Sequence, residues 1–153
     1  MKRILARLGV MITGVAAALA IVALMGSASA QSGLLGQEKT IVPLIKPSWI
    51  SFRNYNGRQL IYFTMLQTYR CGLREIRYSL NSEDLDRRFA LPPCDPQRPN
   101  AIDAEKYPPY ISLPMGAVQS AAVQVTFADG SASAVARFTP CDTPGDSACA
   151  VLR

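Results

Sequence analysis

The sequence contains no histidine among its 153 residues. This absence excludes Ser-His-Asp and Cys-His catalytic sites, imidazole metal ligands and an imidazole pH switch. Lysine is scarce after residue 30, where Lys39, Lys46 and Lys106 occur, and no Ser-x-x-Lys pattern is present to activate a serine. These absences disfavour catalysis, and the sequence alone identifies no specific function.

Residues 1–30 have the pattern of a secretory signal peptide. The segment starts with the basic residues Lys2, Arg3 and Arg7. An uncharged, mostly apolar run follows over residues 8–26, and the small residues Ala28 and Ala30 form the cleavage site. The apolar run falls within the roughly 17–25 residues that can span a bilayer, so an uncleaved membrane anchor is the alternative. No twin-arginine pair is present in this segment, which indicates export in the unfolded state.

Processing changes the charge of the chain. Removing residues 1–30 takes away three of the 16 basic residues and none of the 11 acidic ones, which leaves a net charge of +2. This small excess predicts no nucleic-acid partner. We expect three parts: a signal peptide over 1–30, a flexible lead-in over 31–39, and a single disulfide-stabilised domain over 40–153.

The four cysteines, Cys71, Cys94, Cys141 and Cys149, all lie after the signal segment. An even count in a small exported domain predicts disulfides, because an oxidising compartment favours them. Of the three possible pairings we expect Cys71–Cys94 and Cys141–Cys149. No pair has the spacing of a zinc knuckle or a redox dithiol, so we expect no metal and no cofactor. The compartment is expected to be the periplasm or the exterior of a Gram-negative bacterium.

Alternating patterns and turns predict an all-β domain. Asn56-Gly57 and Asp129-Gly130 are typical of tight hairpin turns, and six prolines exclude regular structure over 92–109. About seven short strands are expected from the segments Thr40–Ile45 (an edge at best), Ser48–Phe52, Gln59–Tyr69, Leu73–Leu80, Arg88–Leu91, Tyr110–Leu113, Val118–Phe127 and Ser131–Thr139. This number favours an immunoglobulin-like or fibronectin-like antiparallel β-sandwich, with a small barrel as the alternative.

Three segments carry a resemblance: Glu75–Asn81 (EIRYSLN), Tyr110–Leu113 (YISL) and Val123–Gly130 (VQVTFADG). Over residues 60–139 the chain resembles fibronectin type III and immunoglobulin-like accessory domains, above all the small sandwich of chitobiase-type glycosidases. The four cysteines and the proline-rich insertion depart from that pattern. The resemblance implies an accessory or binding module, and it carries over no catalytic residue.

Arginines concentrate in the middle third of the chain and make the strongest candidate for a binding surface. The planar guanidinium pairs bidentately with carboxylate or phosphate, so such a cluster suits an anionic partner. The candidate partner-binding residues are Arg74, Arg77, Arg87, Arg88, Tyr107 and Tyr110. The alternative is ordinary surface charge, balanced by the acidic residues nearby.

Two other chemistries use those acidic residues. Glu75 with Glu83 or Asp84 would be the carboxylate pair of a small hydrolase or carbohydrate-active protein. Glu83, Asp84 and Asp86 could bind calcium, but they lack the glycine and distal glutamate of a calcium loop. We therefore expect a non-enzymatic exported protein that binds a protein or envelope component, at this surface or by strand addition, and touches the membrane only through an uncleaved signal segment. The oligomeric state stays open.

Overall fold

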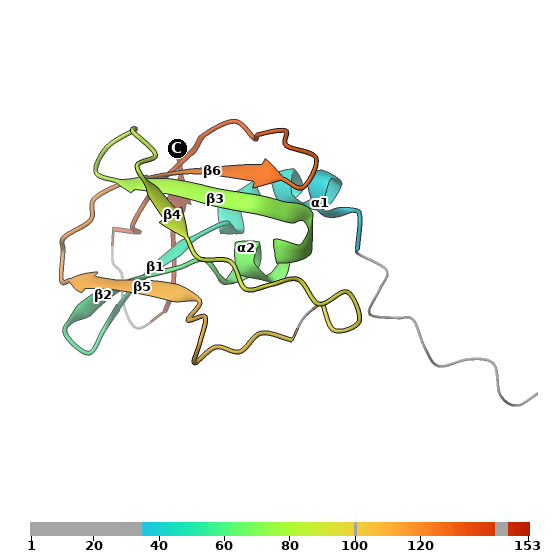
Figure 1. Cartoon of the computed structure of the whole chain (residues 1–153). Helices are drawn as coiled ribbons and strands as arrows, with labels where there is room; N and C mark the ends of the chain where they lie inside the picture. The colour runs from blue at the N-terminus through green and yellow to red at the C-terminus, as the bar shows by residue number, and fades with distance from the viewer. Residues whose placement is uncertain (1–34, 100, 143–146) are drawn as a thin grey trace, which may run out of the picture.

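The computed structural model describes residues 35–99, 101–142 and 147–153. It contains two antiparallel sheets, which Figure 1 shows as two layers with α1 and α2 at one end. The three-stranded sheet has the order β1 (Ser51–Tyr55), β2 (Arg58–Tyr62) and β5 (Tyr110–Pro114). The five-stranded sheet has the order β4 (Arg87–Phe89), β3 (Leu73–Leu80), β6 (Ala121–Phe127), β7 (Ala136–Thr139) and β8 (Val151–Leu152). The predicted all-β, sandwich-like fold class is confirmed.

Four short helical segments accompany the sheets in the described part of the chain. They are α1 (Glu38–Leu44), the 3₁₀ turn η1 (Lys46–Ser48), α2 (Thr64–Thr68) and the 3₁₀ turn η2 (Arg70–Gly72).

The β1–β2 hairpin follows from its turn residues. Asn56 has a φ of 49° and Gly57 a φ of 72°, the left-handed conformations that a two-residue hairpin turn requires. Tyr55 then pairs with Arg58, and the register continues to Ser51 opposite Tyr62. The predicted hairpin is confirmed.

The pair β3–β6 forms the centre of the five-stranded sheet. Ile76, Tyr78 and Leu80 of β3 alternate with polar residues, and Ile76 lies opposite Val125 while Tyr78 lies opposite Val123. All of these except the half-buried Leu80 are buried, as the period-two pattern predicts.

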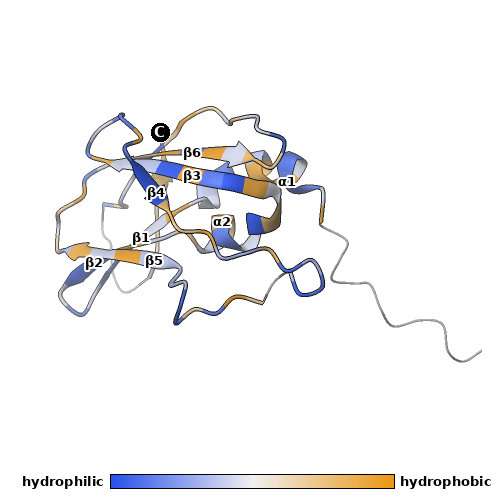
Figure 2. Ribbon diagram, in the orientation of Figure 1, coloured by the Kyte–Doolittle hydropathy of each residue, from blue (hydrophilic) through white to orange (hydrophobic). Residues whose placement is uncertain are grey.

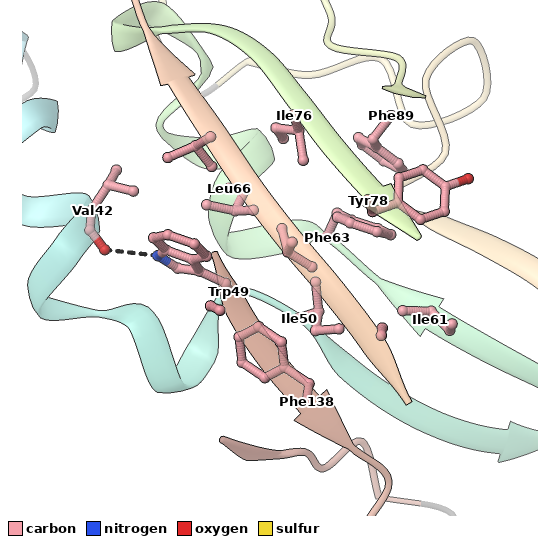
Figure 3. Packing of buried hydrophobic residues seen from close by; sticks show 14 of the residues in the cluster. Val42, Trp49, Ile50, Ile61, Phe63, Leu66, Ile76, Tyr78, Phe89 and Phe138 are labelled. Atoms are coloured by element: carbon pink, nitrogen blue, oxygen red, sulfur yellow. Dashed lines mark hydrogen bonds between the residues drawn. The ribbon is translucent and has the colours of Figure 1, made fainter. Parts of the chain in front are cut away.

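Side chains of both sheets and of the helical segments fill the space between the layers (Figure 3). Phe63 stacks on Phe89 at a centroid distance of 4.3 Å and packs against Tyr78 at 5.2 Å. Trp49, with no exposed surface, fills the part of the core near α1. The core therefore joins the two sheets through aromatic contacts.

The prediction of an edge strand over Thr40–Ile45 is wrong, because this segment lies in α1. Its β-branched residues favour a strand locally. The helix instead turns Val42 fully into the core, and the indole of Trp49 donates a hydrogen bond to the Val42 carbonyl at 2.7 Å (Figure 3). Carbonyls in the last turn of a helix lack intrahelical partners, so this tertiary contact stabilises the helix.

The helix also includes Glu38 and Lys39, which the sequence assigns to the lead-in. Glu38 is buried and packs on Gly72, where a Cβ would come within 2.6 Å of the glutamate Cγ. The Lys39 ammonium donates to the Asp129 carboxylate at 2.5 Å and holds the pKa of Asp129 well below its usual range. Both contacts fix α1 to residues distant in the chain.

The single long strand expected over Gln59–Tyr69 is also wrong in its second half. Strand β2 ends at Tyr62 and α2 follows, with Leu66 fully buried. The buried amide of Gln67 donates to the Tyr107 carbonyl at 3.0 Å, a partner on the proline-rich segment. A mixed apolar and polar run of this length does not by itself distinguish a strand from a strand followed by a helix.

The end of the chain closes one side of the sandwich. Of the strand predicted over Ser131–Thr139, the last four residues form β7, and β8 was not predicted. Phe52 and Cys149 exchange two backbone hydrogen bonds of 2.9 and 2.8 Å, so the segment leading into β8 pairs with β1, while β8 itself pairs with β7. The two sheets are therefore joined on this side, and β4 and β5 are the outer strands of the opposite side.

Both predicted disulfides are confirmed. Cys71–Cys94 has a Cα separation of 4.8 Å and Cys141–Cys149 one of 5.9 Å. Beside the first, the side chain of Arg70 is 3% exposed and donates hydrogen bonds to three backbone carbonyls of the proline-rich segment, those of Pro93, Pro99 and Ala101. The segment over 92–99 and 101–109 has no helix or strand, as predicted, and is held by these bonds and the disulfide.

Candidate functional site

An open groove of about 590 Å³ lies along β3 and β4 and contains two of the predicted arginines. Figure 2 shows most of β4 in hydrophilic colours, and hydrophilic bands that alternate with hydrophobic ones along β3. We call this feature the arginine groove, and its lining residues are Arg74, Glu75, Arg88, Phe89, Ala90, Leu91 and Thr126. Its position at the outer strand β4 leaves one long side open to solvent.

Arg74 occupies a special place in this groove. The pairing of β3 with β6 shifts between Leu73 and Glu75, which leaves Arg74 without an opposite residue. Such a bulge redirects a side chain out of the regular alternation. Arg74 is exposed and has no ion pair or hydrogen bond to another described residue, so its guanidinium is available to an external anion.

Glu75 organises the other arginines of the groove. Its Oε1 accepts a hydrogen bond from Arg77 Nε at 3.0 Å and forms an ion pair with Arg88 Nε at 2.6 Å. Arg77 and Arg88 lie directly opposite one another on β3 and β4. One carboxylate thus holds two cations in place, and the positive charge of the groove exceeds the negative charge.

Arg87 lies in a different environment from Arg74 and Arg88. It lies opposite Tyr78, donates a side-chain hydrogen bond to its phenol, and is 3.9 Å from Asp86. Burial raises the pKa of Tyr78 above its ordinary value of 10.0, and the charge of Arg87 partly opposes that rise. Arg87 is therefore occupied by an internal contact and does not line the groove.

Replacing Arg87 with glutamine is expected to raise the pKa of Tyr78 further, because burial then acts unopposed by a nearby cation. The pKa of Tyr78 is higher in the folded protein than in the unfolded chain. Its contribution to the free energy of unfolding is therefore fully present below pH ~10 and is lost as the pH rises through the folded-state pKa. Ultraviolet titration of the phenols measures this, with Tyr78→Phe identifying the signal. Arg88→Gln should leave the titration unchanged, and an equal shift there would contradict the assignment.

The two predicted tyrosines lie away from the arginine groove. The carbonyl of Tyr107 accepts from Gln67, and its ring lies 5.4 Å from the Lys106 ammonium. Tyr110 begins β5 in the other sheet, where its ring packs on Tyr62 at 5.3 Å. The predicted site residues therefore do not form a single surface.

Tyr110 belongs instead to a surface that the sequence reasoning missed, the outer face of the three-stranded sheet. The register aligns three cross-strand rows: Ser51, Tyr62 and Tyr110; Arg53, Leu60 and Ser112; Tyr55, Arg58 and Pro114. We call these nine residues the tyrosine–arginine face. The period-two alternation of residues 51–55 could have identified this face from the sequence, because it places Arg53 and Tyr55 on the side of the strand opposite to the buried Phe52.

Three of the carboxylates considered for catalysis or calcium binding, Glu75, Glu83 and Asp86, form ion pairs with different arginines. Glu75 binds Arg77 and Arg88, whereas Glu83 lies 2.7 Å from Arg137 of β7. Across the described ranges no three residues among Cys, Asp and Glu come together to hold a metal ion. This arrangement favours the interpretation of the acidic residues as charge partners of the arginines.

A second pocket, of about 450 Å³, lies between α1 and the β6–β7 turn. Two carboxylates line it, but Asp129 is bound by Lys39 and Glu38 packs on Gly72. We assign it no role.

Within the described ranges no helix has the length and apolar character needed to cross a membrane. The predicted signal segment, residues 1–30, lies outside those ranges. Comparisons with protein-family models, curated proteins and solved structures found no match to this chain.

Proposed function

We propose that this chain is an exported, non-enzymatic binding module that takes up an acidic, extended segment of an envelope protein at the arginine groove. The observation that carries the proposal is Arg74, an arginine held out of the strand alternation with no internal counter-ion. Desolvating an unpaired guanidinium is unfavourable unless an anion accompanies it, so a carboxylate-bearing partner suits the groove.

The backbone supports an extended partner. Strand β4 pairs only with β3 in the described structure, so its other edge can accept a further strand. Phe89 is buried beside this edge, and Ala90 continues the groove as an exposed residue. A partner strand along β4 would bring its carboxylates close to Arg74 and Arg88. The sequence instead offers Thr40–Ile45 or Ser131–Thr139 as edges for strand addition. The first is helical, and β7 in the second lies between β6 and β8.

The location belongs to the same proposal. The two disulfides are consistent with an oxidising compartment, and the pattern of residues 1–30 supports a cleaved signal peptide. We place the mature protein in the periplasm or outside the cell. An accessory role agrees with the resemblance to fibronectin-like modules.

The test uses a photo-crosslinking amino acid at position 90 in the full chain, expressed in its native envelope. We expect a crosslink to one envelope protein, mapped to an acidic segment. The variant Arg74→Gln/Arg88→Gln should reduce the yield on the order of tenfold, because it removes two charge-assisted contacts. Circular dichroism should show an unchanged fold, since both side chains are exposed.

Two controls make the result specific. Arg137→Gln removes an exposed arginine of the same sheet outside the groove and should leave the crosslink intact. The photo-reactive residue at Ala134, exposed on the β6–β7 connection, should give no such product. Equal crosslinking from position 134, or an unchanged yield in the double variant, would rule out the arginine groove as the contact.

A further inference from the structure

The tyrosine–arginine face combines flat rings with positive charge and has no acidic residue among its nine members. Tyr55 is 53% exposed and Tyr110 is 38% exposed, while Leu60 at the centre is buried beneath its neighbours. Partly exposed tyrosine rings offer a flat apolar surface and a polar hydroxyl to a ligand. The composition therefore points to a ligand that has both apolar faces and anionic groups.

Internal contacts hold both arginines of this face in position. Arg58 donates from Nε to the Ser112 hydroxyl at 3.0 Å and from Nη2 to the Ser112 carbonyl at 3.1 Å. The guanidinium of Arg53 lies 4.5 Å from the centre of the Tyr55 ring. Neither side chain has an ion pair with a described residue, so two fixed positive charges face outward without counter-ions.

A second, independent observation concerns Arg53. Its Nε atom is buried and has no hydrogen-bond partner among the described residues. A buried charged donor without a partner is unfavourable, so such an atom needs an explanation in a folded protein. Because Nε is covered, a ligand carboxylate would pair with the terminal nitrogens of this guanidinium and not with Nε itself.

From these observations we propose that the tyrosine–arginine face binds an acidic polysaccharide, with sugar rings on Tyr55, Tyr62 and Tyr110 and uronate carboxylates at Arg53 and Arg58. A sugar ring has an apolar face that packs on an aromatic ring. A planar guanidinium pairs with the carboxylate of an acidic sugar.

The size of the face favours a chain over a single sugar. Tyr55 and Ser51 are at opposite ends of β1, and Tyr62 lies opposite Ser51, so the rows that carry the tyrosines are about 13 Å apart at the usual rise per residue. One sugar ring is too short to contact both rows. An extended oligosaccharide along the strands contacts both tyrosine rows and the arginines between and beside them.

Two other anionic occupants fit less well. A nucleic-acid strand is bound mainly through many phosphate contacts, and this face has two arginines on a mature chain of net charge +2. An anionic membrane is recognised by clusters of several basic residues, again more than this face provides. A polymer with spaced carboxylates matches two separated cations.

The test measures binding of the mature protein to an oligogalacturonate by calorimetry, with a neutral cello-oligosaccharide of the same length and free galacturonate for comparison. The acidic oligomer should bind at least tenfold more tightly than either. Arg58→Gln should weaken binding by about tenfold or more, because a charge-assisted pair is lost. Tyr55→Ala should also weaken it, whereas Tyr55→Phe, which keeps the ring, should bind nearly as well as the wild type.

Arg88→Gln is the matched control, since it removes the same charge from the other sheet and should leave the affinity for the oligomer unchanged. No binding of the acidic oligomer, equal affinity for the neutral oligomer or for free galacturonate, or equal losses in Arg58→Gln and Arg88→Gln would overturn the proposal. Binding to phosphatidylglycerol vesicles or to single-stranded DNA in place of the oligomer would do so too. Failure here leaves the crosslinking prediction for the arginine groove untouched, because the two use different residues.

Discussion

Replacing Trp49 with alanine is expected to lower the free energy of unfolding by about 3–5 kcal/mol. The indole has no exposed surface, packs at the α1 side of the core and donates to the Val42 carbonyl at 2.7 Å. The substitution opens a large cavity and also leaves that carbonyl without its donor. Native domains have a free energy of unfolding of about 5–15 kcal/mol in total, so this change should remove a large part of the stability of the protein.

Urea unfolding followed by far-ultraviolet circular dichroism measures this effect, because the variant lacks the only tryptophan of the chain. Leu44→Ala is the control, as Leu44 ends α1 with 76% of its surface exposed. It should change stability by less than about 0.5 kcal/mol. A loss below about 1 kcal/mol in Trp49→Ala would show that the indole does not hold α1 against the core.

Removing the Cys71–Cys94 disulfide, as Cys71→Ala/Cys94→Ala, should lower the free energy of unfolding by about 3.5 kcal/mol in the chain-entropy model. The bond spans 23 residues, so its loss frees a long loop in the unfolded chain. It also releases one end of the proline-rich segment, which then depends on the hydrogen bonds from Arg70. The effect of Arg70→Met should therefore be larger in the variant without this disulfide than in the wild type.

The second disulfide provides the comparison. Cys141–Cys149 spans 8 residues, and Cys141→Ala/Cys149→Ala should lower stability by about 2.5 kcal/mol in the chain-entropy model. The difference is measured by urea unfolding of the two double variants, as the free energies of unfolding extrapolated to water, because freeing a loop in the unfolded chain also changes the slope. A larger loss from the shorter loop would show that native contacts near Cys149, and not loop length, control the effect.

The sequence predicted the parts of the fold in which local pattern and tertiary environment agree. Strand β3 has clean alternation, and the turn at Asn56 and Gly57 has residues suited to positive φ, so both were predictable. Helices α1 and α2 could not be predicted from the sequence. Their residues become helical because Val42 and Gln67 find partners far along the chain, and such partners are invisible in a local window.

The candidate sites, too, were predictable only where neighbouring residues in the sequence are also neighbours in the structure. Sequence clustering identified Arg74 and Arg88 as neighbours, but it grouped them with Arg87, which contacts Tyr78, and with Tyr110, which lies on the other sheet. The tyrosine–arginine face combines β1 and β2 with β5, which enters from the far side of the proline-rich segment. Only the pairing of β2 with β5 reveals it, and pairing between distant strands depends on the whole fold.

The hydrogen bonds between Phe52 and Cys149 also set the order in which the fold can be completed. A chain made from its amino terminus exposes β1 long before its second neighbour exists, so this edge stays unpaired until Cys149 has been synthesised. Contacts of such wide sequence separation slow folding, and an open edge in the meantime invites pairing with other chains. Self-association should therefore be greatest in truncated or unfinished chains and should fall once this last segment is in place.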